Sequence, residues 1–574
     1  MSLEIYDCIL REGEQAEGAS FSFKDRIELA LKLDEFGVDY IELGWPIVSS
    51  EIFDSFRAVI SRIKKAKVVA FGSTSIKENP AEDKNLNSIL DCGAKYACIF
   101  GKSSLMHVEK QLKISREENL NKIYSSIKFL TDNGIKVFYD AEHYFDSFII
   151  NKEYALNSLI KALEAGADRI ILCDTNGGIL PDKAKEIIKD TKETLKKKGF
   201  DVKLGVHFHD DCGLALANTL ACLPYIIQVQ GTINGTGERL GNLNFSEFLP
   251  VYMKKLGNKL EINLKELKKL NEEAFRLSGI EIPEKRAFVG ERAFSHKAGV
   301  HIDAHSKGAS YEHEAPQDFG NKRTILLNSL GGRSSIINLA EQFGYKLDKE
   351  NVNVRENIEE LFKELKECEV AGYKIGSIKA EQFLLIEKYF GEFNKLNSPS
   401  STPKKSFEGI FGPKNSSEGI FRKPKKTDGF DDFSKNILAF NILEWEIKSE
   451  FKNRKEVSNF KVVCRVNNEI IEGEMSVEGG PVDAAFKTLK KILSKKFSQI
   501  EELNILDFHV SIARQNSEES SVRTRIDFTN KEEFSCVGVD KNMLGSAIEA
   551  LEKGFRFYLL NLMKEAERRQ DDSC

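Results

Sequence analysis

The sequence predicts an α/β protein built on a TIM (β/α)8 barrel, with helical accessory subdomains and a C-terminal α+β domain after it. Two observations predict the barrel: eight short strand-like runs alternate with helix-period stretches near the start of the chain, and polar residues gather where those runs end. Eight such units within about 250 residues are what a TIM barrel requires. A doubly wound open sheet, with about five to seven strands, is the structural alternative.

The strand-like runs are short and apolar, and turn residues separate each from the helix-period stretch that follows. Two of these stretches, Phe23–Phe36 and Glu153–Glu164, are clearly amphipathic. The runs are Glu4–Leu10, Tyr40–Leu43, Lys67–Phe71, Tyr96–Phe100, Lys136–Ala141, Arg169–Cys173, Lys203–His209 and Gln228–Ile233.

The chain length of 574 residues requires more than one hydrophobic core. We assign residues 1–275 to the barrel and 276–393 to helical accessory subdomains that cover the active site. Residues 394–436 are rich in Ser, Pro, Lys and Gly and are expected to form a flexible linker. Glu-Gly-Ile-Phe occurs in it twice, either as a local duplication in a tether or as a docking peptide.

Residues 437–574 are expected to form a separate domain of two similar β-rich units, each closed by a helix. The first unit reaches Val477–Phe486 and continues as a basic amphipathic helix to Lys496. The second reaches Cys536–Asp540 and continues as a helix over Asn542–Leu560. No cluster of titratable residues in this part indicates chemistry, so ligand sensing or dimerisation is the expected role.

Composition excludes several classes of protein. The 84 basic and 89 acidic residues give a net charge of −5, which does not favour nucleic acid as a partner. The N-terminal ten residues lack the features of a secretory signal, and no apolar run approaches the roughly 20 residues that a membrane helix needs. The ten cysteines are scattered, without a Cys-x-x-Cys pair, and Cys8, Cys98, Cys173 and Cys464 lie in apolar runs as small buried side chains. A cytoplasmic enzyme without disulfides is expected.

The segment Val206–Asp211 carries the strongest chemical signal, the His-x-His pair of His207 and His209. The alternation of a strand places both imidazoles on one face, at the end of the seventh predicted strand. Active sites of TIM barrels lie at this C-terminal rim, and two neighbouring imidazoles there are typical of a metal site. A lone histidine would more often be structural.

Two other strand ends can complete this site. The first predicted strand ends with Arg11 and Glu12, and the eighth runs into a Gly-rich turn that ends at Asn242. Two imidazoles, a carboxylate and an amide oxygen form a mixed N/O set that suits Mn²⁺, Zn²⁺, Fe²⁺ or Mg²⁺. The alternative for Arg11 and Glu12 alone is a surface ion pair, worth about 0–1 kcal/mol.

These motifs, in this order, resemble the acyl-CoA-dependent barrels of the isopropylmalate, homocitrate and citramalate synthases, with hydroxymethylglutaryl-CoA lyase as a relative. Within that family the chain is most similar to the citramalate synthases. Glu12 stands where these more often have Asp, and the arginine expected just after Gly72-Ser-Thr74 is absent. The motifs that carry the resemblance are Leu10–Gln15, Gly44–Pro46, Cys98–Ser103, Tyr139–His143, Cys173–Gly178, His207–Gly213, Gly237–Asn242, His296–His301 and Ser310–His313.

The resemblance implies that Glu12, His207, His209 and Asn242 bind a divalent metal, with Mn, Zn or Mg as candidates, and that pyruvate chelates it. It implies that Arg11 stabilises the oxyanion on the keto oxygen and that Thr175 binds the pyruvate carboxylate. His301, with Glu142 oriented towards it, is the expected base that deprotonates acetyl-CoA. Asp303 and Tyr311 would position the thioester or the hydrolytic water.

The implied reaction is a Claisen condensation of acetyl-CoA with pyruvate, followed by thioester hydrolysis to (R)-citramalate and CoA. The resemblance also implies a homodimer and a C-terminal regulatory domain that senses isoleucine, the end product of the pathway. The alternatives are the same chemistry with 2-oxoisovalerate or 2-oxoglutarate, a lyase that cleaves the carbon–carbon bond, and an amino-acid sensor on an inactive barrel.

Overall fold

The computed structural model describes residues 3–296, 311–327, 332–373, 375–391, 440–452, 455–467, 469–515, 520–530 and 532–571. The predicted linker with its Glu-Gly-Ile-Phe repeat lies outside these residues. The chain divides into two compact units, one of Met1–Phe294 with Glu312–Arg323 and the other of Ser295–Tyr311 with Thr324–Cys574. The finer domain boundaries expected from the sequence stay predictions.

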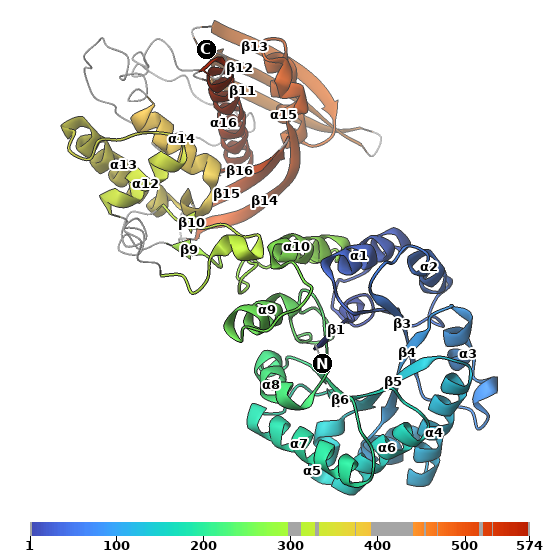
Figure 1. The fold of residues 1–574 in the computed structure, drawn as a ribbon. Coiled ribbons are helices and arrows are strands. Elements are labelled where there is room, and N and C mark those ends of the chain that lie inside the picture. The colour runs from blue at the N-terminus through green and yellow to red at the C-terminus, as the bar shows by residue number, and fades with distance from the viewer. Residues whose placement is uncertain are drawn as a thin grey trace. The chain divides into compact units, whose positions relative to one another are not determined.

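Eight parallel strands close into a barrel in chain order, from β1 to β8, and β8 pairs with β1 (Figure 1). Every strand-like run of the sequence contributes one strand, so the predicted TIM barrel is confirmed and the open sheet is excluded. The strands are β1 (Glu4–Asp7), β2 (Tyr40–Gly44), β3 (Lys67–Ser73), β4 (Tyr96–Lys102), β5 (Lys136–Glu142), β6 (Arg169–Asp174), β7 (Leu204–Phe208) and β8 (Gln228–Gly231).

Helices surround the strands as an outer ring (Figure 1). The first begins at a capping box, in which Ser22 and Asp25 bond each other's backbone N–H groups, and it ends at Gly37 with φ of 104°. The helices of this unit are α1 (Phe23–Phe36), α2 (Ser50–Ile60), α3 (Lys84–Asp91), α4 (Arg116–Asp132), α5 (Tyr144–Ile150), α6 (Lys152–Glu164), α7 (Pro181–Lys197), α8 (Ala215–Cys222), α9 (Phe245–Pro250) and α10 (Leu267–Ser278).

Two layers of apolar side chains support the barrel. Aliphatic residues between the strands and the helices form a continuous core that runs through this unit. A smaller cluster of largely aromatic side chains, including Tyr6, Tyr40 and Phe138, forms a separate buried core contributed by the strands themselves. These cores hold the strand ends, and with them the polar side chains that follow each strand, in fixed positions.

Among its described residues, the second unit begins with a two-stranded parallel pair of β9 (Ser295–His296) and β10 (Thr324–Ile325), and the helices α12 (Arg333–Gln342), α13 (Val352–Ala371) and α14 (Lys379–Phe390) follow. The helices pack around a buried cluster that includes Ile336, Leu361 and Phe390. None of the described helices in either unit is long and apolar enough to cross a membrane.

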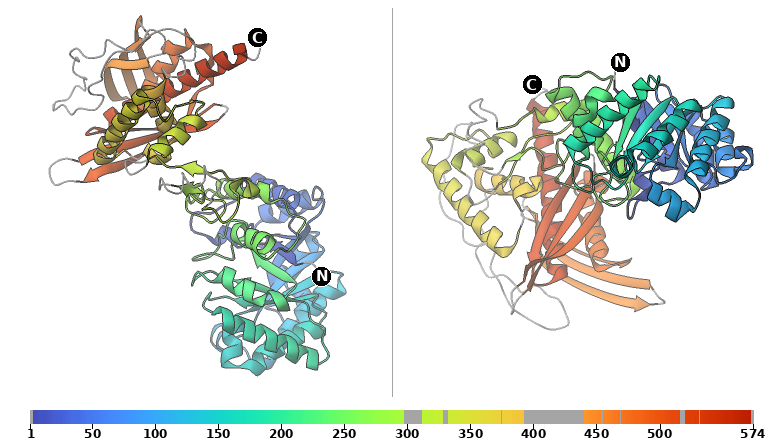
Figure 2. Two further views of the ribbon diagram at one scale, coloured as in Figure 1. Left: turned by 60° about the vertical axis from the view of Figure 1, so that its left-hand side comes forward. Right: turned by 90° about the horizontal axis from the view of Figure 1, so that it is seen from below.

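The C-terminal part consists of two three-stranded antiparallel sheets, each followed by a helix, as the sequence predicted (Figure 2). In the first, β11 (Phe440–Lys452), β12 (Lys455–Val466) and β13 (Glu469–Glu478) lead into α15 (Pro481–Ser494). In the second, β14 (Asn504–Gln515), β15 (Ser520–Thr529) and β16 (Glu533–Asp540) lead into α16 (Met543–Asp571).

The helix α14 packs against this C-terminal part. Ala380 and Phe383 of α14 belong to the same apolar core as both sheets and α16, and the ring of Phe383 lies 5.4 Å from that of Phe557. Glu381 accepts a hydrogen bond from the backbone N–H of Val537 at 2.7 Å. The accessory helices and the C-terminal sheets therefore share one core within this unit.

Candidate active site

Glu12, His207 and His209 converge at the mouth of the barrel, where the sequence predicted a metal site. One ligand atom from each lies within 4.8 Å of the others, and all three residues are buried. His207 lies in β7, and His209 follows the strand by one residue. Their ring centroids are 5.1 Å apart, as expected for two side chains on one face of an extended segment.

The charge states of this group suit metal binding. Burial lowers the pKa of His209 to about 4, and the neighbouring His207 adds to this effect, so the imidazole of His209 is neutral near pH 7. Burial raises the pKa of Glu12, but Arg11 and the two imidazoles outweigh it and leave this pKa below its usual value. A neutral imidazole and an ionised carboxylate are the forms that bind a metal ion.

The polar atoms of Asn242 also fit a metal ion at this place. Its backbone pairs with that of His209 in an isolated bridge, and both atoms of its side-chain amide are buried without a hydrogen-bond partner among the described residues. A Cβ atom at Gly237 would lie 2.0 Å from Asn242 Nδ2, so a glycine is needed there. A buried amide without a partner is costly, and a bound ion would relieve that cost.

Gln230 orients one of the imidazoles. Its Oε1 lies 2.8 Å from His207 Nδ1, which leaves Nε2 of His207 for a ligand. Behind it, Asp140 Oδ1 accepts hydrogen bonds from Gln230 Nε2 at 3.3 Å and from Cys98 Sγ at 3.0 Å. Sequence analysis treated Cys98 only as a small buried side chain and gave Gln230 and Asp140 no individual role, because a sequence does not show which strand interiors face each other.

Arg11 lies between two carboxylates. Its guanidinium forms an ion pair with Glu12, and its Nε donates to Glu42 Oε1 at 2.5 Å. The other oxygen of Glu42 accepts from the hydroxyl of Tyr6 at 2.5 Å, and the guanidinium lies 3.7 Å from the ring centroid of Phe71. Sequence analysis missed Glu42, although a single acidic residue in the apolar run Tyr40–Leu43 was a signal for it.

Glu142 and Thr175 lie at the C-terminal ends of β5 and β6. Glu142 is the last residue of β5 and pairs with Lys102, the last residue of β4. Thr175 Oγ1 accepts a hydrogen bond from the backbone N–H of His143 at 2.8 Å. His143 has a φ of 58°, an unusual conformation for a residue other than glycine, and such residues are enriched at functional sites.

Arg239 ties the neighbouring loops together. It donates to Asp211 after β7 at 2.7 and 2.9 Å and to the carbonyl oxygen of Thr175 after β6 at 2.8 Å. Its φ is 59°, so a second strained residue lies at the mouth. These bonds connect the loops after β6, β7 and β8, which carry Thr175, His209 and Asn242.

A cavity of about 330 Å³ opens beside His143. Ser104, His143 and Asn176 from three successive strand ends contribute to its wall. His143 stacks on His107, with ring centroids 3.9 Å apart. This cavity lies on the C-terminal side of the strands, next to the predicted site residues, and offers room for a substrate.

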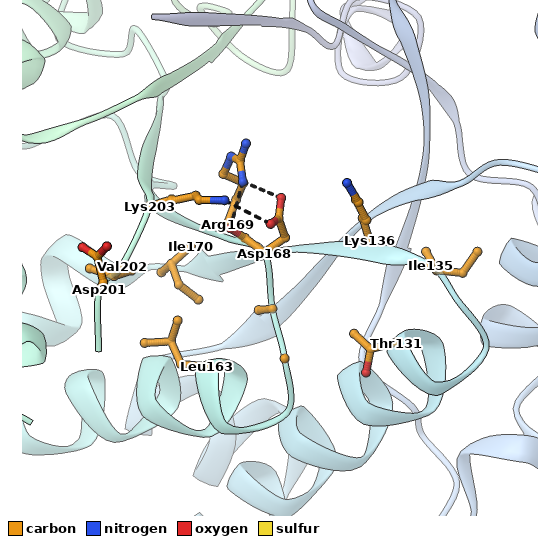
Figure 3. A pocket seen from close by; sticks show the side chains of 12 residues that line it. Thr131, Ile135, Lys136, Leu163, Asp168, Arg169, Ile170, Asp201, Val202 and Lys203 are labelled. Carbon is orange, nitrogen blue, oxygen red and sulfur yellow. Dashed lines mark hydrogen bonds and ion pairs between the residues drawn. The ribbon is translucent and has the colours of Figure 1, made fainter. Parts of the chain in front are cut away.

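A second cavity, of about 400 Å³, lies at the opposite ends of the strands (Figure 3). Lys136 and Arg169, which begin β5 and β6, and Lys203, which precedes β7, contribute to its lining. Arg169 and Lys203 are paired with Asp168, and Arg169 also with Glu4. Groups at this end of a TIM barrel usually serve stability, and these ion pairs fit that role.

The other three predicted site residues lie outside the described residues of the barrel unit. His301 and Asp303 fall within 297–310, outside the described residues. Tyr311 belongs to the second unit and is 59% exposed. The roles of all three stay predictions.

A closed eight-stranded barrel whose mouth gathers a carboxylate, two imidazoles and a buried arginine defines a class, the metal-site barrel enzymes. Family models match the chain in three places: HMGL-like over residues 2–273, homocitrate synthase post-HMGL domain-like over 288–369, and the LeuA allosteric (dimerisation) domain over 430–559.

The similar proteins narrow this class. The chain is 35% identical to the (R)-citramalate synthase of Sulfolobus acidocaldarius over 97% of both chains, and 35% identical to that of Aquifex aeolicus over 98% of both. The 2-isopropylmalate synthase of Sulfolobus acidocaldarius is 34% identical but covers 66% of this chain. The chain belongs to the (R)-citramalate synthase family of acyl-CoA-using transferases.

Proposed function

We propose that the protein condenses acetyl-CoA with pyruvate and hydrolyses the resulting thioester, releasing (R)-citramalate and CoA. The observation that carries this proposal is the buried group of Glu12, His207 and His209 beside Arg11, in a chain that matches citramalate synthases over nearly its whole length. The 2-isopropylmalate synthase of Sulfolobus acidocaldarius, by comparison, matches 66% of this chain.

Arg11 is proposed to stabilise the negative charge that develops on the keto oxygen of pyruvate. Its contacts with Glu12, Glu42 and the ring of Phe71 fix the guanidinium before any substrate binds. A donor that is held in place loses no free energy to reorganisation when charge develops, and this is usually a large contribution to catalysis.

Thr175 is proposed to hold the pyruvate carboxylate. Its oxygen already accepts the N–H of His143, so its hydroxyl hydrogen is left to donate to a carboxylate oxygen. His301, with Glu142 oriented towards it, is proposed to take the methyl proton of acetyl-CoA. Asp303 and Tyr311 are proposed to position the thioester and the hydrolytic water.

Aromatic side chains support a small 2-oxo acid as the substrate. The ring of Phe71, against which Arg11 lies, stacks on Phe100 at 5.6 Å, and Trp45 meets both rings edge-on. These rings fill space beside Arg11, which favours the methyl group of pyruvate over the isopropyl group of 2-oxoisovalerate.

Glu12, His207, His209 and Asn242 are proposed to hold a divalent ion, with Mn²⁺, Zn²⁺ and Mg²⁺ as candidates for this mixed ligand set. When bound, such an ion supplies Lewis-acid polarisation of the keto oxygen and a template for the 2-oxo acid.

The C-terminal part is proposed to bind isoleucine as a feedback inhibitor and to form a homodimer. What supports this is the match of residues 430–559 to the LeuA allosteric (dimerisation) domain, together with the two similar sheet-and-helix units. A cytoplasmic location stays a prediction from the sequence.

The test is CoA release from acetyl-CoA by the purified, Mn²⁺-supplemented protein with pyruvate, 2-oxoisovalerate and 2-oxoglutarate in parallel. We expect release with pyruvate at a kcat/KM at least about tenfold above the other two acids, because extra methyl groups in a filled pocket are discriminated by about 10–200-fold. A preference for a larger acid would reassign the substrate. No release with any of the three would overturn the proposed reaction.

A further inference from the structure

Lys102 is a buried cation at the mouth of the barrel to which the proposed mechanism gives no role. It is the last residue of β4, and its side chain is 11% exposed. Its ammonium group pairs with Oε2 of Glu142, and the two residues are direct register partners in β4 and β5. Lysine is rarely buried unless it is paired, so this position has a specific electrostatic partner.

The backbone around this pair is held by a network of hydrogen bonds. The carbonyl oxygen of Lys102 accepts from Asn119 Nδ2 at 2.8 Å, and Asn119 also donates to the hydroxyl of Tyr154 at 2.9 Å. The N–H of Ser103 donates to the carbonyl oxygen of Glu142 at 3.2 Å. The ends of β4 and β5 therefore present the ammonium and carboxylate groups at a fixed separation.

The other oxygen of Glu142 faces a neutral group. Its Oε1 lies 4.0 Å from His143 Nε2, and burial and the nearby His107 lower the pKa of His143 below its usual value. Among the described residues, Lys102 is the one permanently charged partner of this carboxylate.

We propose that Lys102 is a positioning residue, which fixes the Glu142 carboxylate in the orientation needed for proton transfer during the condensation. This inference rests on the proposed function, which makes Glu142 part of the proton-transfer machinery. A carboxylate on a flexible side chain gains a single orientation when one of its oxygens is held in a buried ion pair. The second oxygen, Oε1, lies 4.0 Å from Nε2 of His143, a residue that lines the cavity, and is then left for the reaction.

The test compares Lys102→Met, Lys102→Arg, Glu142→Gln and the double variant Lys102→Met/Glu142→Gln in the full chain, by CoA release with pyruvate. We expect Lys102→Met to lower kcat about 100-fold, since a misplacement of about 1 Å costs that much, with the KM for pyruvate nearly unchanged. Lys102→Arg keeps the charge and is expected to recover kcat to within about tenfold of the original protein. The double variant should have a kcat no lower than that of Glu142→Gln alone, because both substitutions remove the same function, proton transfer through Glu142.

The matched control is Lys152→Met. Lys152 forms an ion pair with Asp190 on the surface, where the two side chains are 47% and 41% exposed, so its loss should leave kcat unchanged. Mn²⁺ affinity, measured by calorimetry, should be the same in every variant. If Lys102→Met does not fold, Lys102→Gln, which keeps a hydrogen-bond donor without the charge, replaces it.

Any of three results would overturn the inference. The first is a normal kcat in Lys102→Met, and the second is a kcat in Lys102→Arg as low as that of Lys102→Met. The third is a double variant whose loss of kcat equals the product of the losses in the two single variants. In each case activity of the unchanged protein with pyruvate would leave the proposed function standing. If the unchanged protein instead uses a larger 2-oxo acid, that acid replaces pyruvate in the comparison. No activity with any 2-oxo acid would overturn the proposed function and this inference together.

Discussion

Arg11 is held by several groups at once, as its proposed catalytic role requires. Its guanidinium contacts Glu12, Glu42 and the face of Phe71 at the same time, and only a planar group with several donors can do so. Arg11→Lys should therefore lower kcat by at least about 100-fold, the usual effect of losing an oxyanion donor. The metal content of the purified variant, measured by mass spectrometry, should remain that of the original protein.

Near-normal turnover in Arg11→Lys would contradict the role assigned to the guanidinium. The companion variant is Glu42→Gln, which keeps the shape of the side chain but removes the charge opposite Arg11. It should also reduce kcat, because the guanidinium loses the partner that directs it. If either variant contains less metal than the original protein, the main effect of Arg11 and Glu42 would be to position the proposed metal ligand Glu12.

Asp7 provides a pH test that is independent of catalysis. Its Oδ1 accepts the N–H of Ile9 at 2.9 Å, but Oδ2 is buried without a partner among the described residues. Burial raises the pKa of Asp7 from 3.8 to about 7. The folded protein therefore keeps this proton up to about pH 7, whereas the unfolded chain releases it near pH 4. Stability from this group is full below about pH 4 and is lost as the pH rises through 7.

Asp7→Asn cannot ionise and should escape this loss. The difference in unfolding free energy between the variant and the original protein should grow by about 3 kcal/mol, in favour of the variant, from pH 5 to pH 8. Urea unfolding at the two pH values measures it. A difference that stays constant with pH would show that Asp7 is ionised in the folded protein at both.

At the scale of elements, the alternation of short apolar runs and amphipathic stretches was enough to predict all eight barrel strands. The ends were less certain: His209 was placed within the seventh run, whereas β7 ends at Phe208 and His209 forms an isolated bridge to Asn242. The alternation of side chains along an extended chain still places both imidazoles on one face, because the backbone stays extended beyond the last hydrogen bond of β7. The last residue of a strand is defined by its hydrogen bonds to neighbouring strands, and the sequence of one strand does not contain this information.

The site was predicted where chemistry follows directly from residue type and spacing, as in His207 and His209. Glu42, Gln230 and Lys102 were missed because their roles depend on which strands are neighbours. Lys102 meets Glu142 through the pairing of β4 with β5, and His207 meets Gln230 through the pairing of β7 with β8. In a TIM barrel, strands that follow one another in the sequence are neighbours in the sheet. Comparing the inward-facing residues of each predicted strand with those of the next strand would therefore have located these pairs.

The contact of α14 with the C-terminal part depends on a buried ionic cluster. Lys553 of α16 lies 3.2 Å from Glu381 and 3.1 Å from Glu549, and it donates to the carbonyl oxygen of Val537 at 2.7 Å. The two carboxylates accept the backbone N–H groups of Val537 and Val539, which lie in β16 at the edge of its sheet. The cluster thus satisfies backbone groups that an edge strand would otherwise leave unpaired.

Lys553→Met should destabilise the second unit by about 3–5 kcal/mol, because it leaves the buried carboxylate of Glu381 and the partly buried carboxylate of Glu549 without their cation. Lys553→Met/Glu381→Gln should lose less, since one of those charges is gone as well. The exposed pair of Lys455 and Glu478 supplies the control, and Lys455→Met should cost no more than about 1 kcal/mol. Scanning calorimetry of the full chain measures all three. Equal losses in Lys553→Met and Lys455→Met would mean that the cluster adds little to stability.

At the scale of the whole molecule, the shared core changes how regulation should be tested. Removing residues 437–574 would expose Ala380 and Phe383, which are buried together with residues of the C-terminal sheets. Such a truncated chain would lose stability as well as any response to isoleucine, so its inhibition data would not separate the two effects. The full chain is the better material, and its two units provide separate readouts.

Calorimetry with ligands can assign the two proposed binding functions to the two units. A ligand at 100 times its Kd adds about 2.7 kcal/mol to the unit that binds it, so each ligand should raise the unfolding temperature of its own unit. Mn²⁺ with pyruvate should raise the transition of the barrel, and isoleucine should raise the transition that Lys553→Met lowers. If isoleucine raises the transition of the barrel instead, its binding site lies in the barrel and not in the C-terminal part. If it raises neither transition, isoleucine does not bind, and the proposed feedback inhibition is wrong.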